Sequence, residues 1–211
     1  MTREEDALDP ATLLMKDSSH SVVGKPVLRH LPGEEGLWVF IGGDLVVFSL
    51  FFGLFLYYRA QNPAMFEQSH VALNRGLGLL NTLVLLTSSL FVATAVTNAR
   101  KGLHARAGRL LIAAIACGIV FGVTKVFEYS AKFKAGIVFD TNDFFMFYFM
   151  LTGIHMVHVA FATSVLFYLW AQTRGAVRGT NYVSVMEAGG VFWHLVDLLW
   201  VVLFALLYLL A

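Results

Sequence analysis

Five ionisable side chains lie inside long apolar segments of this sequence: Asp44, His155, His158, His194 and Asp197. An ionisable side chain in hydrocarbon costs a few kcal/mol, so such a group normally faces protein or water and has a partner. His194 and Asp197 are three residues apart, on one face of a helix and within reach of each other. The five groups lie at similar depth on three segments, and could form one buried polar network.

Three kinds of chemistry fit such a network. Hydrogen bonds among the buried groups would fix how the helices pack. The same groups could instead pass protons, because histidine and aspartate both titrate. A metal or haem site is the third option, since His155 and His158 share a helix face. Two histidines without further convergent ligands are not a complete set, so we expect no catalytic, cofactor or metal ligands in this chain.

The segments that carry these groups indicate an all-α, polytopic membrane helix bundle. Of the 211 residues, 58% are hydrophobic and 14% charged, whereas soluble domains are about 45–50% apolar and about 25% charged. Each apolar run has about 20 residues or more, enough for a helix to cross about 30 Å of hydrocarbon. We expect a polar cytoplasmic tail at 1–35 and a transmembrane domain at 36–211, with five spans at about 36–58, 77–96, 110–129, 144–170 and 188–210.

Lysine and arginine residues are distributed unevenly between the two sides of these spans. Ten of them lie in the tail, in the loop between the second and third spans and in the loop between the fourth and fifth, and four lie in the remaining loops. Cytoplasmic loops are enriched in positive residues. The N-terminus is therefore expected in the cytoplasm and the C-terminus outside.

Small residues spaced by four mark faces on which a neighbouring helix can approach closely. Ser49 and Gly53 form such a pair in the first span. Ala114, Gly118 and Gly122 form a longer stripe in the third span. We expect both sets to serve helix packing.

Other side chains near the buried groups have simpler roles. Trp193 and Trp200 flank the ionisable pair of the last span and supply bulk for packing. Glu128 and Glu187 lie near span ends, where solvated or headgroup-level charges are expected, although Lys125 is three residues from Glu128 and could pair with it. A formal charge of +1 without a basic arm gives no surface for nucleic acid.

Five motifs follow one another along the spans: Asp44 in a Phe-rich first span, Leu80-Asn81-Thr82, Phe127-Glu128-Tyr129, TGIHMVHV at 152–159 and FWHLVDLLW at 192–200. In residue type and order they resemble subunit III of the haem–copper respiratory oxidases. The resemblance covers about residues 36–210, and the collinear order makes it specific although each motif alone is short.

The resemblance implies an all-helical subunit beside catalytic subunit I and the other oxidase subunits. Such a subunit carries no haem or copper of its own, so the redox centres belong to its partners. It also implies a buried acid at Asp44, bound phospholipid, and a role in sustaining proton uptake and protecting the catalytic subunit. Because five-span forms are usual in bacterial oxidases, the bacterial cytoplasmic (inner) membrane is the expected location.

The sequence departs from the family pattern in two respects. The longer mitochondrial-type subunit has seven spans, and the first two have no counterpart here, which puts a lipid cleft between two helix groups in doubt. The usual glutamate of the first span is Asp44 here. The Gly42-Gly43-Asp44 run and the Tyr57-Tyr58-Arg59 ending look more like accessory membrane proteins of bacterial nitric oxide reductases. That branch remains an alternative partner assignment.

A free-standing proton channel or transporter is the alternative from another functional class, since it would also use buried aspartate and histidine. The five unsymmetric spans and the collinear motifs speak against it. A free-standing enzyme is less favoured still, because no nucleophile–base set is visible in the sequence.

The cation asymmetry makes the membrane orientation testable. Reporter fusions after Lys134 are expected to behave as external, and fusions after Arg178 as cytoplasmic. Alkaline phosphatase and fluorescent-protein fusions at both positions measure this directly. The reverse pattern would overturn the orientation.

Overall fold

The computed structural model describes residues 35–175 and 181–210. Residues 1–34 of the expected polar tail lie outside this range. The described chain is helical, as predicted, with elements α2 (Glu35–Gln61), α3 (Pro63–His70), α4 (Arg75–Arg100), α5 (His104–Lys134), α6 (Asp143–Arg174), α7 (Tyr182–Phe204) and the π-helix η1 (Ala205–Leu210).

Five of these helices are long and apolar enough to cross a membrane, which confirms the predicted number of spans. They are longer than the apolar runs that predicted them. Helix α5, for example, extends several residues beyond both ends of the expected 110–129 span. Backbone hydrogen bonding does not stop where hydrophobicity falls, so polar residues continue the helix into the headgroup region.

Two asparagines set the starts of spans. The Asn142 side chain accepts a hydrogen bond from the Phe145 backbone N–H at 3.0 Å at the start of α6. Asn74 does the same for Leu77 at 3.1 Å at the start of α4. Each cap satisfies one of the backbone N–H groups that the first helical turn leaves without a partner.

The short helix α3 was not anticipated from the sequence. It begins with Pro63 in the first turn, where a proline loses no helical hydrogen bond. Its residue Phe66 is fully buried, and its ring centroid lies 5.4 Å from that of Phe55 in α2 and 5.7 Å from that of Phe144 in α6. Helix α3 therefore links α2 to α6 through aromatic contacts.

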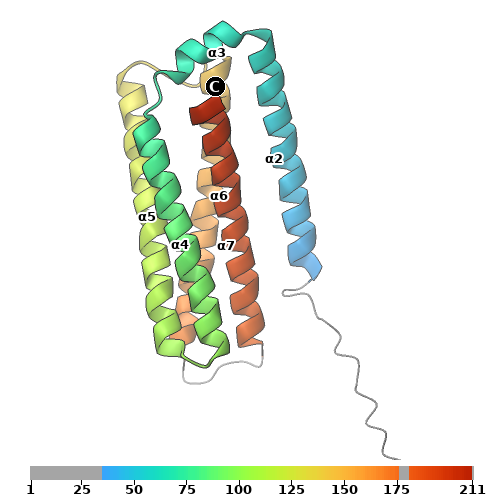
Figure 1. The fold of residues 1–211 in the computed structure, drawn as a ribbon, viewed down its shortest axis with the longest axis vertical. Helices are drawn as coiled ribbons and strands as arrows, with labels where there is room; N and C mark the ends of the chain where they lie inside the picture. The colour runs from blue at the N-terminus through green and yellow to red at the C-terminus, as the bar shows by residue number, and fades with distance from the viewer. Residues whose placement is uncertain (1–34, 176–180, 211) are drawn as a thin grey trace, which may run out of the picture. The chain divides into compact units, whose positions relative to one another are not determined.

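Helices α4, α5, α6 and α7 pack side by side, with α7 against both α4 and α6 (Figure 1). Helix α7 is the most buried span, and α2 is the least buried. The main contacts of helix α2 are with α3, α6 and α7. The last span is thus the one around which the described bundle is built.

The small residues of the sequence differ in what lies against them. Ala114 is fully buried, and a Cβ built on Gly118 would lie 3.0 Å from both Thr163 and Trp193. At Gly122 the nearest such atom is 4.0 Å away, and at Gly53 nothing lies within 4 Å. Ser49, one turn before Gly53, is also exposed. Of the small residues singled out from the sequence, Ala114 and Gly118 are therefore the ones that are closely packed within the described chain.

Gly78 of α4 provides a test of this packing. A Cβ at this position would lie 2.9 Å from ring atoms of both Phe204 and Tyr208. Because two aromatic rings would have to move, we expect Gly78→Ala to lower the free energy of unfolding by about 1–3 kcal/mol. The matched control Gly53→Ala should be neutral or more stable by up to about 1 kcal/mol. Denaturant titrations of the purified full chain, followed by circular dichroism, measure both; equal values would contradict the packing.

Candidate functional site: polar clusters between the spans

Asp44 of α2 and His158 of α6 form a hydrogen-bonded pair. Asp44 Oδ1 lies 3.0 Å from His158 Nε2, and His158 Nδ1 lies 2.9 Å from the carbonyl oxygen of Ile154. The two side chains are 10% and 18% exposed respectively. The Phe48 ring packs edge-on against the imidazole with centroids 5.5 Å apart. This pair is the polar link between α2 and the other spans that the structure provides.

His194 of α7 bonds to α4 rather than to Asp197. Its Nδ1 lies 2.5 Å from the Ser89 hydroxyl oxygen. The Asp197 carboxylate lies near Ser89 but makes no hydrogen bond of good geometry in the described chain. Residues three apart share a helix face without pointing in the same direction. Here Asp197 is buried and His194 is half-buried, and both lie near Ser89.

His155 lies in the aromatic interior of the bundle. Its side chain is fully buried, and within the described chain neither ring nitrogen has a hydrogen-bond partner. The ring packs edge-on against Phe121 and lies 5.3 Å, centroid to centroid, from Trp200. The five ionisable groups expected to form one network therefore fall into three places: the Asp44–His158 pair, His155 alone, and the neighbourhood of Ser89.

A further polar cluster, at Lys125, joins α5 to η1. Lys125 Nζ donates to Glu128 Oε2 and to the Tyr208 hydroxyl, both at 2.8 Å. The Tyr208 hydroxyl in turn donates to Glu128 Oε1 at 2.7 Å. The ammonium also lies 4.6 Å from the centroid of the Trp200 ring, a cation–π distance. Every charge in this cluster has a partner.

Glu128 corrects one expectation. A position near a span end suggested a solvated or headgroup-level charge, but the side chain is 5% exposed. The reason is that α5 continues to Lys134 and η1 covers this part of it. In the sequence, the position of Lys125 three residues before Glu128 indicated that the two could form a pair. Nothing in the sequence indicated that Tyr208 would complete the cluster.

Two further links tie the same end of the bundle together. His70 Nε2 lies 3.0 Å from the backbone oxygen of Tyr208, which connects α3 to η1. Lys132 of α5 donates through Nζ to the carbonyl oxygen of Ala72 in the loop after α3. The sequence does not indicate either of these two links, because short loops give no indication of which carbonyl oxygens will face a neighbouring helix.

Glu187 lies at the opposite end of the bundle. It accepts a hydrogen bond from Arg100 Nε at 2.7 Å, with side chains 20% and 57% exposed. The two tryptophans of α7 are almost fully buried. Trp193 lies against Gly118, and Trp200 Nε1 donates to the Thr82 hydroxyl at 3.1 Å. They fill the interior on either side of Asp197.

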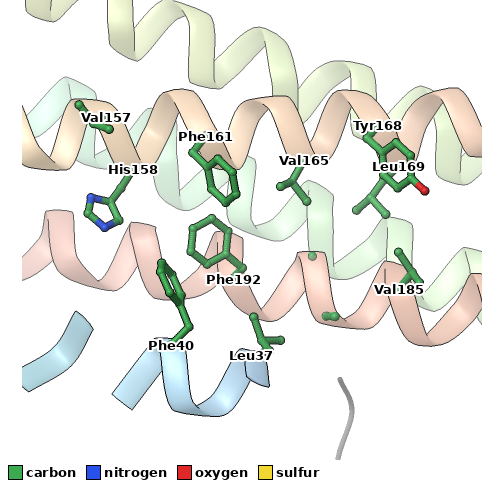
Figure 2. Close-up of a pocket in the computed structure, with 12 residues that line it drawn as sticks. Leu37, Phe40, Val157, His158, Phe161, Val165, Tyr168, Leu169, Val185 and Phe192 are labelled. Carbon is green, nitrogen blue, oxygen red and sulfur yellow. The ribbon is translucent and has the colours of Figure 1, made fainter. Parts of the chain in front are cut away.

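An apolar groove of about 700 Å³ lies between α2, α6 and α7 (Figure 2). We call it the α2–α6–α7 groove. His158, at one end, and Tyr168 are its two lining residues with polar side chains. Its other lining residues include Leu37, Phe40, Phe161, Val185 and Phe192. In residues 35–175 and 181–210, no group of three histidine, cysteine, aspartate or glutamate side chains is placed to hold a metal ion.

These features define a multi-pass helical membrane protein whose buried polar groups mainly connect one helix to another. A family model described as Cytochrome c oxidase subunit III matches residues 34–211. The chain therefore belongs to the cytochrome c oxidase subunit III family, as the sequence motifs suggested.

Known relatives agree with this assignment. The chain is 29% identical to cytochrome c oxidase subunit 3 of Alkalihalophilus pseudofirmus, over 92% of this chain and 95% of that protein. It is 30% identical to the protein of the same name from Synechocystis, over 91% and 80% respectively. It is also 25% identical to a heme-copper oxidase subunit I+III of Aeropyrum pernix, over 83% of this chain and 22% of that protein.

The Lys125–Glu128 pair generates a stability prediction. Removing one member leaves a charge without its partner in a buried site, so Lys125→Met should cost about 3–5 kcal/mol of unfolding free energy. The double variant Lys125→Met/Glu128→Leu should cost less, since no charge remains. Arg100→Met, which breaks the exposed pair with Glu187, should cost about 0–1 kcal/mol.

Denaturant titrations of the wild-type chain, Lys125→Met, Glu128→Leu and the double variant give the coupling energy of the pair as a double-mutant cycle. If the double variant loses as much unfolding free energy as the two single variants lose together, the two residues are not coupled.

Proposed function

We propose that this chain is the non-redox subunit III of a bacterial haem–copper terminal oxidase, and lies beside the catalytic subunit in the cytoplasmic membrane. Haem and copper belong to the partner subunits. The chain supports the stability of the catalytic subunit and its proton uptake during oxygen reduction. The observation that carries the proposal is the family match from residue 34 to 211, which includes all five spans.

The choice of partner is supported by the Aeropyrum pernix relative. That protein is named as subunits I and III together, and this chain aligns with 22% of it. One polypeptide that holds both subunits keeps them adjacent in the membrane. We infer the same neighbour for this chain, as a separate polypeptide.

A supporting role also fits what the buried side chains do. The Lys125 cluster, the Ser89–His194 bond and the Asp44–His158 pair each connect two helices. Buried polar contacts of this kind fix helix packing. Asp44 and His158 are in addition titratable groups at the edge of the α2–α6–α7 groove, which suits a role in proton supply.

The α2–α6–α7 groove suits an apolar ligand. Its lining is almost entirely aliphatic and aromatic. Phe40 of α2 and Phe192 of α7 face each other across it, with ring centroids 5.9 Å apart (Figure 2). We infer that the acyl chain of a bound phospholipid occupies it.

Purification tests the partner. An affinity-tagged chain, isolated in mild detergent from its native membrane, is expected to bring a haem-containing oxidase catalytic subunit with it, and the difference spectrum of the eluate should show that haem. An equally tagged unrelated multi-pass protein serves as control. Elution with a nitric oxide reductase would favour the accessory-protein assignment, and a chain without a haem partner would favour a free-standing channel or transporter.

Oxidase turnover tests the part played by Asp44. If the carboxylate helps to supply protons, Asp44→Asn should leave the yield of the complex unchanged while turnover slows or decays sooner at high pH, where protons are scarce. Oxygen consumption at several pH values, with yield measured by haem content, separates the two effects. A wild-type pH profile would remove Asp44 from proton supply.

Asp197 provides a structural comparison in the same assay. Asp197→Asn should be mild, because the amide keeps the size and polarity of the side chain, whereas Asp197→Leu should reduce the yield of the complex. Wild-type yield in both variants would mean that this buried carboxylate has no part in assembly.

A further inference from the structure

Helix α2 meets the other spans along one narrow face. Ile41, Phe48 and Phe55, spaced by seven residues, are its three buried hydrophobic residues. Asp44 lies on the same face and is the one Asp, Glu, Lys, Arg or His residue of α2 between 36 and 58. Apolar packing and the polar contact between Asp44 and His158 therefore hold this helix against α6. Polar contacts between helices add to apolar packing when spans associate in a membrane.

The geometry of His158 fixes how many protons this contact contains. The carbonyl oxygen of Ile154 can only accept, so the Nδ1 atom that contacts it carries a hydrogen. The 3.0 Å contact between Nε2 and Asp44 Oδ1 is then a hydrogen bond only if one more proton lies between them. Either the imidazole holds it, as a cation facing a carboxylate, or the carboxyl group holds it and donates to Nε2.

We propose that His158 and Asp44 together bind one exchangeable proton, and that this proton fastens α2 to α6. When the proton leaves, a lone pair on Nε2 faces a charged carboxylate in a buried site, and the attraction becomes a repulsion. Helix α2, the least buried of the five spans, is then released. The inference concerns this chain itself and does not depend on the proposed oxidase partner.

No other group in the described chain replaces that proton. Asp44 Oδ2 is buried and has no hydrogen-bond partner there. His155, one turn before His158 on α6, is buried against Phe121 and Trp200. No donor from its ring therefore reaches the pair in the structure.

The ionisable groups of the neighbouring helices are engaged elsewhere. On α5, Lys125 and Glu128 bond to each other and to Tyr208. On α7, His194 bonds to Ser89 of α4, and Asp197 lies near the same serine. Between 36 and 58, the other ionisable side chains of α2 are Tyr57 and Tyr58, more than three turns along the helix from Asp44. When the shared proton has left, none of these charged groups therefore compensates the negative charge of Asp44.

The pair lies where a proton can be exchanged. His158 lines the α2–α6–α7 groove, and its ring lies at one end of the groove (Figure 2). The α2 side of that groove is formed by Leu37 and Phe40, within two turns of Asp44. Release of α2 therefore also widens the groove. Proton occupancy of the pair and the width of the apolar groove are linked.

A distance measurement across the two helices tests the proposal. Spin labels are attached at Val46→Cys and Val157→Cys, both exposed positions, in a Cys117→Ser full chain in nanodiscs. Double electron–electron resonance is recorded from about pH 5 to about pH 10, a range that includes histidine titration. We expect one short, narrow distance at low pH and a longer, broader distribution at high pH.

Asp44→Asn decides whether the shared proton is the cause. An amide N–H can donate to Nε2, and the amide does not ionise in this pH range, so the short distance should persist at every pH. Asp197→Asn is the matched control, since this buried carboxylate of α7 makes no contact with α2, and it should keep the wild-type response. A wild-type distance that does not change with pH, or an Asp44→Asn variant that follows the wild-type transition, would overturn the proposal.

If the Asp44→Asn variant does not fold, a second measurement on the wild-type chain still tests the proposal. In the wild-type chain labelled with ¹⁵N-histidine, the His158 signal, assigned by its loss in His158→Gln, should titrate at the same pH as the distance changes. A titration at a different pH, or none, would equally overturn the proposal.

Discussion

The ammonium group of Lys125 places the strongest constraint on this bundle. A cation with no exposed surface is stable only if it is paired and hydrogen-bonded. Two oxygens, from Glu128 and Tyr208, accept hydrogen bonds from it, and the Trp200 ring lies at a cation–π distance. To bring Tyr208 there, α7 must continue into the π-helix η1 and lie against α5. Since α7 also packs on α4 and α6, this one requirement fixes the last span relative to three other helices.

Fold class and number of spans could be predicted because both depend on run length and composition, which are local properties. Hydrocarbon thickness sets the length of a span, and 18 or more apolar residues are read reliably as a helix. The helix ends and α3 could not be predicted in the same way. Asn142 and Pro63 are ordinary loop residues in the sequence, and become a cap and a helix start only in context.

The sequence indicates the ionisable residues within the spans, but only some of the contacts that the structure gives them. Lys125 and Glu128 lie on one helix, so their spacing indicated the contact. The Asp44–His158 bond joins residues 114 positions apart, and His194 reaches Ser89 across 105. Such contacts depend on which helices are neighbours, and apolar periodicity does not determine that for spans that are hydrophobic on every side.

The Lys125 cluster also constrains how the protein is made. Tyr208 follows Lys125 by 83 residues, and translation adds about 5–20 residues per second, so the two are synthesised roughly 4–17 s apart. Throughout that interval the lysine and Glu128 are already in a span but have only each other. The nascent chain therefore carries an incompletely solvated ion pair, and the membrane insertion machinery has to shelter it until the last helix arrives.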